Sequence, residues 1–223
     1  MTTTAHPSLT IIDPPAEQFG KSAQEVATDV TQRRVLRKAL GSYDVAYAKA
    51  KGRFVDHEDA RRRAARIKRD AVEHLADYLE QFEANVLKNG GQVHWAQTAD
   101  DATKIILDIA KKAGVTHVVK SKSMATEEIH LNESFEKAGI EPIETDLGEY
   151  ICQLRDEPPY HFVTPVMHLT KKDIADTFEE KLRIPRTEVA EELTMIAREK
   201  LRGEFTTSLM GVTGGNFLVA DVG

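Results

Sequence analysis

Residues 98–145 read TADDATKIILDIAKKAGVTHVVKSKSMATEEIHLNESFEKAGIEPIET, and in this stretch amphipathic helices alternate with short β-prone runs. Thr98, with Asp101 three residues later, has the spacing of a capping box, so we expect a helix that begins here and ends before Gly114. The β-prone runs are His117–Lys120 and Glu141–Thr145, and a second helix is expected between them. This alternation predicts crossover units on a mainly parallel sheet.

The residues that follow and precede this stretch extend the pattern. Further strands are expected at Val93–Ala96, His161–Met167 and Asn216–Val222. Apolar residues at helical spacing mark the buried sides of three helices: Leu131, Phe135 and Ala138; Ile174, Phe178 and Leu182; Val189, Leu193, Ile196 and Ala197.

The N-terminal part, from Ser22 to Lys88, is charged, rich in alanine and free of proline. We expect two long helices with a break near Lys51–Phe54. One apolar stripe follows the break: Ala64, Ile67, Ala71, Leu75, Tyr78, Leu79, Phe82 and Val86. The predicted fold class is therefore α/β, a mainly parallel sheet with flanking helices over residues 89–223, preceded by an α-helical N-terminal region over residues 1–88.

Composition and charge exclude several classes of protein. The 223 residues carry a net charge of −6, which does not favour nucleic acid, and the basic run between Arg61 and Arg69 is interpreted as a solvated helix face. The first fifteen residues lack the pattern of a signal peptide, and no apolar stretch is long enough to be a transmembrane segment. We expect a cytoplasmic protein.

Cys152 is the only cysteine, which excludes an intrachain disulfide, a zinc site built on several thiolates and an iron–sulfur cluster held by this chain alone. His161 and His168 would lie on opposite faces of the expected strand, so no metal site is predicted. No Gly-x-Ser-x-Gly motif indicates a serine hydrolase.

Three segments at expected strand ends carry candidate chemistry. The first offers the ammonium groups of Lys120 and Lys122 and the hydroxyls of Ser121 and Ser123 between a strand and a helix, which suits an anion. The alternative is that Thr126 caps the helix and both lysines are merely exposed. The residue types alone leave both interpretations open.

The second segment, residues 144–150, has three carboxylates within six residues. Glu144 is a weak candidate for a general base, a covalent nucleophile or a cation ligand. Asp146 and Glu149 have capping-box spacing, and we favour a capping role for both.

The third segment is the glycine-rich run at residues 210–217, expected to precede a strand. That order does not fit a dinucleotide-binding fingerprint, which needs strand, glycines and helix. Gly211, Thr213, Gly214 and Asn216 are candidates for binding an anion or substrate, although tight-turn geometry is the more frequent reason for such glycines. Without a resemblance, the residues predict an α/β domain with an anion-friendly turn and nothing more specific.

Five segments in matching order and spacing resemble the LutB family of LUD-domain iron–sulfur proteins: GGQVHWA (90–96), VVKSKSMATEEIHLN (118–132), GIEPIETDLGEYICQL (139–154), PYHFVTPVMH (159–168) and MGVTGGNFLVADVG (210–223). The resemblance implies a fold related to ribose-phosphate isomerases, glucosamine-phosphate deaminases and CoA transferases. It further implies a cytoplasmic complex with LutA-like and LutC-like subunits that oxidises L-lactate to pyruvate and passes electrons through 4Fe-4S clusters.

The family continues beyond the segment matching residues 211–223 with more of the LUD domain and a cysteine-rich ferredoxin-like region, which this chain lacks. We therefore expect no cofactor in this chain, and a C-terminally incomplete LUD domain of limited stability that is inactive alone as an oxidoreductase. Cooperative unfolding at high temperature would count against this expectation.

Two alternatives remain. One is a small-molecule enzyme or binding module of the CoA-transferase or sugar-phosphate-isomerase type, with L-lactate, another small carboxylate or a phosphate at residues 120–123 and Glu144 as base or nucleophile. The other is an assembly module that docks through its N-terminal helices.

Overall fold

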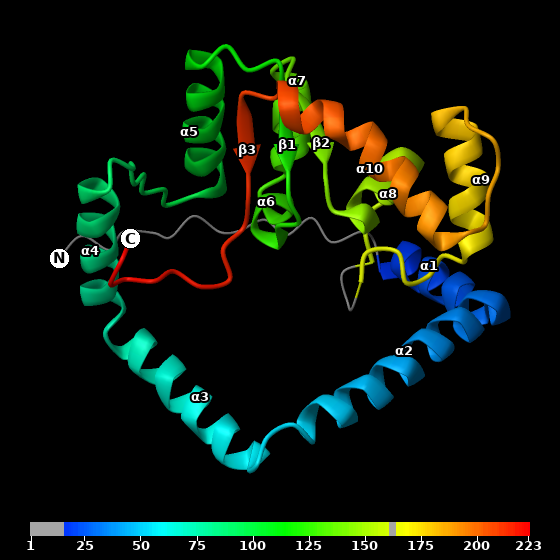
Figure 1. Ribbon diagram of the computed structural model, residues 1–223, viewed down its shortest axis with the longest axis horizontal. Coiled ribbons are helices and arrows are strands. Elements are labelled where there is room, and N and C mark those ends of the chain that lie inside the picture. Colours follow the sequence, from blue (N-terminus) through cyan, green and yellow to red (C-terminus); the bar gives the residue numbers. More distant parts are fainter. Residues whose placement is uncertain (1–15, 161–163) are drawn as a thin grey trace.

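The sheet at the centre of the molecule has three parallel strands in the order β2-β1-β3. The computed structural model describes residues 16–160 and 164–223. The strands are β1 (His117–Lys120), β2 (Glu141–Glu144) and β3 (Met210–Val212). Their parallel pairing, with helices on both sides, confirms the predicted α/β class (Figure 1).

Helices make up most of the described chain, and the N-terminal region is helical as predicted. Their bounds are α1 (Ala16–Thr28), α2 (Val30–Lys51), α3 (His57–Glu73), α4 (Leu75–Lys88), α5 (Ala99–Lys112), α6 (Met124–Glu128), α7 (Leu131–Lys137), α8 (Leu147–Arg155), α9 (Lys171–Leu182) and α10 (Ala190–Thr207). The capping box at Thr98 is present, and β1, β2, α9 and α10 lie where the sequence predicts helices and strands.

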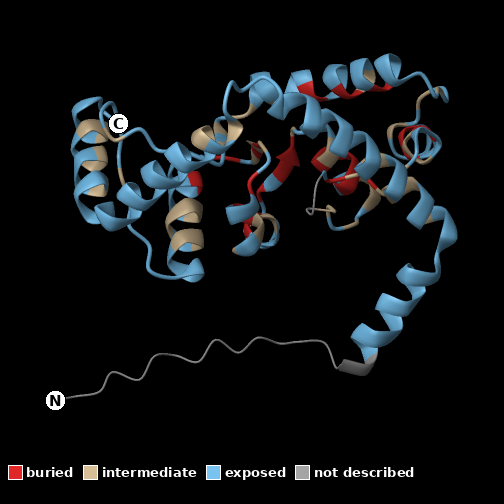
Figure 2. Ribbon diagram, turned by 90° about the horizontal axis from the view of Figure 1, so that it is seen from below, coloured by how far each residue is buried: buried red, intermediate tan, exposed pale blue. Residues whose placement is uncertain are grey.

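Two apolar clusters hold the helices against the sheet. On one side Val118 packs with Leu131 and Phe135 of α7 and with Ala110 of α5. On the other side Ile143 packs with residues of α8, α9 and α10. Figure 2 shows the buried residues gathered around the sheet and these helices.

The chain reverses its direction across the sheet at β1. From β1 it crosses to β2 on one side, and from β2 it returns through α8, α9 and α10 to β3 on the other side. In open parallel sheets, ligands bind beyond the carboxyl ends of strands at such a switch point. The topology thus places the switch point between the ends of β1 and β3, and we call this region, residues 121–123 and 213–215, the crevice.

The described residues of three expected strands do not form those strands. Residues 91–96, which include Val93–Ala96, have no regular structure and no neighbouring strand, and Trp95 instead donates a hydrogen bond from Nε1 to Glu83 of α4 at 2.9 Å. Residues 161–163 lie outside the described part, and Thr164–Met167 forms a turn in which Pro165 accepts from the Tyr160 N–H. His168 lies in a turn and not in a strand, and His161 lies outside the described residues.

The expected strand at Asn216–Val222 is also wrong, because the strand lies earlier, at Met210–Val212. Val212 lies beside Lys120 in the register, whereas residues 217–219 are exposed and run towards α4. The glycines at 214 and 215 therefore follow a strand instead of preceding one.

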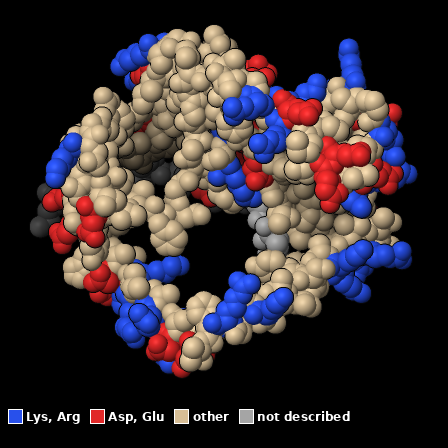
Figure 3. All heavy atoms as spheres, viewed as in Figure 1, with Lys and Arg blue, Asp and Glu red and all other residues tan. Residues whose placement is uncertain are grey.

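The described part of the N-terminal region, residues 16–88, forms four helices and not the expected two. The break after Lys51 is confirmed, and further breaks occur at Asp29, which caps α2, and at His74. No described residue of α2, α3 or α4 is buried, so the apolar stripe does not face a core: Ile67 is 69% exposed. In the space-filling view these helices border an opening through the molecule (Figure 3).

Residues 220–222, near the C-terminal end, contact α4 and its C-terminal cap. Side-chain hydrogen bonds run from Gln81 and Asn85 of α4, and from Asn89 at its C-terminal cap, to Asp221, Ala220 and Val222 respectively. The segment after β3 therefore links the sheet to α4. None of the described helices is both long and apolar enough to cross a membrane.

Candidate functional site

The loops that follow β1 and β3 meet at the switch point. The Ser121 N–H donates to the Val212 carbonyl oxygen at 2.9 Å, continuing the pairing of the two strands. A Cβ placed on Gly214 would lie 2.9 Å from Ser123 Oγ and 3.0 Å from Ser123 Cβ. The first and third candidate segments, about 90 residues apart in sequence, are thus in direct contact.

The remaining residues of the glycine-rich segment are less constrained. Gly211 has room for a side chain, since a Cβ there would meet Val119 Cγ2 only at 3.9 Å. Thr213 and Asn216 are exposed on the loop that leaves the crevice. Gly214 is therefore the position of this segment at which the close approach requires glycine.

Ser123 caps the short helix α6. Its Oγ accepts from the Thr126 N–H at 3.3 Å, and Thr126 donates from Oγ1 to the Ser123 carbonyl oxygen. The interpretation of Thr126 as the cap is wrong, because α6 begins at Met124 and Thr126 lies inside it. The helix also ends early, and α7 begins only after His130, a residue in the left-handed conformation with φ of 51°.

Lys120 is buried and paired, contrary to the expectation of an exposed ammonium. Only 1% of it is exposed, and its Nζ lies 2.7 Å from Oε1 of Glu144, which is itself 7% exposed. Asn132 Nδ2 donates to the same carboxylate oxygen at 2.8 Å. The positive charge that the sequence assigns to the turn is therefore largely balanced within the protein.

Lys122 and Glu149 form a second ion pair beside the crevice, with Nζ and Oε1 3.3 Å apart. Asp146 caps α8 as predicted, accepting from the Gly148 and Glu149 N–H groups. Glu149 is 4% exposed and its carboxylate faces Lys122. The capping role expected for Glu149 is wrong, because the first turn of α8 directs this side chain inward.

A cleft of about 410 Å³ opens next to the Lys120–Glu144 pair. Carboxylates dominate its lining: Glu127, Glu136, Glu144, Glu149, Asp156 and Glu157. A cavity lined by one sign of charge repels ligands of that sign, so this cleft does not suit a small anion. Among the described residues, no group of His, Cys, Asp and Glu has the arrangement of a metal site.

Cys152 is 2% exposed, and burial raises the pKa of its thiol to about 12. A thiol held protonated is neither a nucleophile nor a metal ligand at neutral pH. One buried cysteine does not fit the ligand set of an iron–sulfur cluster, which needs several thiolates.

Two polar residues of this region carry no signal in the sequence. Gln153 of α8 donates from Nε2 to the Pro142 carbonyl oxygen at 2.7 Å and accepts from the Glu144 N–H at Oε1. Its amide thereby occupies the outer edge of β2 as a neighbouring strand would. Asn132, which positions the Glu144 carboxylate, is likewise identified only by tertiary contact.

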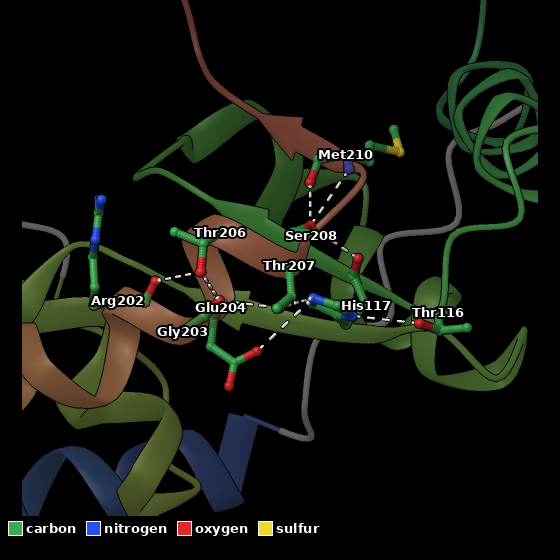
Figure 4. A network of polar contacts seen from close by, with 9 residues as sticks. All are labelled: Thr116, His117, Arg202, Gly203, Glu204, Thr206, Thr207, Ser208 and Met210. Carbon is green, nitrogen blue, oxygen red and sulfur yellow. Dashed lines mark hydrogen bonds and ion pairs between the residues drawn. The ribbon is translucent and has the colours of Figure 1, made fainter.

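The opposite ends of the strands are joined by a polar network around His117 (Figure 4). His117 Nε2 lies 3.1 Å from Thr207 Oγ1, and Ser208 Oγ donates to the carbonyl oxygens of His117 and Met210. These contacts fix the end of α10 against the starts of β1 and β3. The network supports the sheet at the end remote from the crevice.

Comparison with known proteins identifies the domain. The model of the LUD domain family matches residues 79–223. The chain is 45% identical over 209 residues to lactate utilization protein B of Lysinibacillus sphaericus, which covers 92% of this chain and 41% of the relative. It is 47% identical over 167 residues to the Bacillus subtilis protein of the same name, covering 74% and 35%.

A further relative is an uncharacterized electron transport protein, YkgF, of Escherichia coli, 40% identical over 193 residues, covering 85% of this chain and 41% of the relative. The chain thus spans less than half the length of these curated relatives. No solved structure gives a significant match.

Proposed function

Because this chain belongs to the LUD domain family, we propose that it acts as the LUD-domain part of a cytoplasmic lactate-utilization subunit that takes part in oxidising L-lactate to pyruvate. The observation that supports this proposal is the identity of 40–47% to proteins named for lactate utilization or electron transport, extending over at least 74% of the chain. The reaction and the cysteine content of this chain indicate which role belongs to this part and which to the rest of such a subunit.

Oxidation of L-lactate to pyruvate removes two electrons and two protons, so an electron acceptor is required. The single buried cysteine of this chain does not supply cluster ligands. In this proposal the 4Fe-4S clusters are held outside these 223 residues, and the chain contributes the fold of the crevice and the contacts to its partners.

We assign substrate contact to the crevice between the ends of β1 and β3. Ser121 is half-buried there, and Lys122 keeps 36% of its side chain exposed while paired with Glu149. Its partner Glu149 has only 4% of its side chain exposed, so a carboxylate from solvent has better access to the ammonium than to the acid. This crevice suits L-lactate or another small carboxylate better than the acidic cleft does.

We assign contact with LutA-like and LutC-like subunits to α2, α3 and α4. These helices expose large apolar side chains, among them Tyr43, Ile67 and Val72 at 56%, 69% and 73%. Deletion of residues 1–88 is expected to abolish co-purification with these subunits, whereas Lys122→Ala leaves it intact. Co-purification that survives the deletion would remove the assignment.

A chimera tests the function as a whole. In a Bacillus subtilis strain whose growth on L-lactate depends on lactate utilization protein B, the 167 matched residues are replaced by those of this chain. Growth on L-lactate is expected, and Lys122→Ala in the chimera slows it, while the exposed Lys137→Ala does not. A chimera that accumulates normally but supports no growth on L-lactate would overturn the proposal.

The purified chain by itself is expected to show no lactate-dependent dye reduction, because the acceptor lies elsewhere. Dye reduction by the isolated chain would contradict that division of labour.

The buried Glu144 favours a second candidate, an enzyme or binding module of the CoA-transferase or sugar-phosphate-isomerase type. In this candidate the turn at residues 120–123 holds the phosphate or carboxylate, and Glu144, beside Lys120 and Asn132, acts as base or nucleophile. Binding of labelled CoA or a sugar phosphate would support this candidate. Binding unchanged by Glu144→Ala and Lys122→Ala would remove the site.

A further inference from the structure

A second groove lies between α10 and the start of α8, with a volume of about 320 Å³. Ala197 and Leu201 form its floor and are 3% and 6% exposed. Leu147 and Phe205 form apolar walls that remain 39% and 50% exposed. The groove is therefore an apolar depression in the surface, which neither candidate function uses.

Two arginines line the same groove. Arg198 and Arg202 are four residues apart on α10, so their side chains leave the same face of the helix. Within the described part of the chain neither guanidinium forms an ion pair or a hydrogen bond, although α10 carries several glutamates. One of these, Glu204, faces His117 at 3.9 Å, and Figure 4 shows the Arg202 side chain extending away from that network.

The polar groups of the groove favour an anion. The hydroxyls of Thr145 and Thr194 both donate to backbone carbonyl oxygens, of Lys120 at 2.7 Å and of Ala190 at 2.9 Å. The two guanidiniums are therefore the side-chain donors of the lining that a ligand can use. A guanidinium binds a carboxylate through two parallel N–H groups, which a lysine ammonium cannot do.

We propose that this groove binds a small amphipathic carboxylate, with its carboxylate between Arg198 and Arg202 and its hydrocarbon part against Leu147 and Phe205. Paired cations at the rim and exposed apolar walls are complementary to such a ligand in both charge and polarity. The volume lies at the lower end of the range for small-molecule sites. The acidic cleft repels the same ligand by charge, because carboxylates dominate its lining.

Isothermal titration of the full 223-residue chain with octanoate tests the proposal. Saturable binding at one site per chain is expected. Arg198→Gln and Arg202→Gln each weaken it about tenfold or more, because each removes a charge-assisted pair of hydrogen bonds. Lys200→Gln is the matched control, since Lys200 is an exposed cation on the same helix that lines a different cavity.

The role of the apolar wall is tested with Phe205→Ala, which is expected to weaken the binding of octanoate more than the binding of acetate. The thermal unfolding of each variant is recorded to verify its fold. Octylamine and octanol, which share the chain but lack the carboxylate, are expected not to compete. Absence of saturable octanoate binding would overturn the proposal. So would an octanoate affinity of both arginine variants equal to that of the wild type, or octylamine binding as tight as that of octanoate. Self-association that Arg198→Gln abolishes while octanoate fails to bind would assign the groove to a second copy instead. This proposal is independent of lactate utilization, so failure of the chimera leaves it standing.

Discussion

At the residue scale, the buried contact between Lys120 and Glu144 changes the role that the sequence suggests for the lysine. The lysine ends β1 and the glutamate ends β2, and parallel pairing sets the two residues side by side in the register. Their 2.7 Å contact is almost completely shielded from water. A residue that the sequence presents as an anion-binding cation is in the fold one half of an internal pair.

Replacing one member of this pair is expected to lower the free energy of unfolding more than replacing both members. Lys120→Met leaves a buried carboxylate without its cation and should lower the free energy of unfolding by about 3–5 kcal/mol. The double variant Lys120→Met, Glu144→Leu should recover much of that loss, because no buried charge remains. Urea unfolding followed by circular dichroism measures both.

The exposed pair of Lys137 and Glu133, 3.5 Å apart, provides the control. Lys137→Met should change the unfolding free energy by less than about 1 kcal/mol. If Lys120→Met proved equally mild, the buried pair would have no special energetic role.

A second prediction at the residue scale concerns the stability of a variant at Gly214. A Cβ at this position meets Ser123 atoms at 2.9 and 3.0 Å, so Gly214→Ala must push the two loops apart and should cost about 1–3 kcal/mol of stability. Gly211→Ala has room at 3.9 Å and should stay within about 0.5 kcal/mol of the wild type. Equal thermal unfolding of the two variants would contradict the close approach.

At the scale of elements, the sheet ends differently at its two edges. The outer edge of β2 contains Pro142, which has no N–H to offer, and Gln153 satisfies the Pro142 carbonyl and the Glu144 N–H. These devices leave β2 little capacity to pair with another strand. The sheet is therefore closed to further pairing at β2, whereas no equivalent side chain covers β3 in the described part of the chain.

Gln153→Ala is accordingly expected to expose the edge of β2. Loss of two hydrogen bonds should lower the free energy of unfolding by about 1–2 kcal/mol, and light scattering at high protein concentration should reveal increased association. Gln97→Ala, at an exposed loop glutamine, serves as the control. An unaltered tendency to associate would show that Gln153 does not protect the edge.

At the scale of the whole molecule, charge is divided along the chain. Residues 19–69 carry 14 Lys and Arg against 6 Asp and Glu, whereas residues 89–223 carry 15 against 23. Figure 3 shows the basic side chains along α2 and α3. The net charge of −6 conceals a basic helical arm attached to an acidic domain.

The hydrogen bonds between α4 and residues 220–222 hold that arm to the sheet through the segment after β3. Asn85→Ala removes the 2.8 Å bond to the Ala220 carbonyl and should speed amide exchange in both α4 and residues 217–223 by several-fold. Glu80→Ala, an exposed change on the same helix, should leave exchange unaltered. Faster exchange confined to α4 would mean that the two segments are not coupled.

The sequence by itself determined the features that depend on neighbouring residues. The capping box at Thr98 and the cap at Asp146 are local, since each joins groups two or three residues apart. Helical periodicity located α9 and α10 for the same reason. The division of the chain at residue 88 and the roles of the candidate site residues stay predictions.

Tertiary structure alone decided which β-prone runs became strands and which charges reached solvent. A strand exists only where a neighbouring strand can take its hydrogen bonds. Residues 93–96 and 216–222 have no neighbouring strand and form no strand, whereas Met210–Val212 pairs with β1. The same pairing brings Gly214 to Ser123, and the register of β1 and β2 joins Lys120 to Glu144. These contacts link residues 24 to 91 positions apart, and local sequence patterns carry no information on such distances.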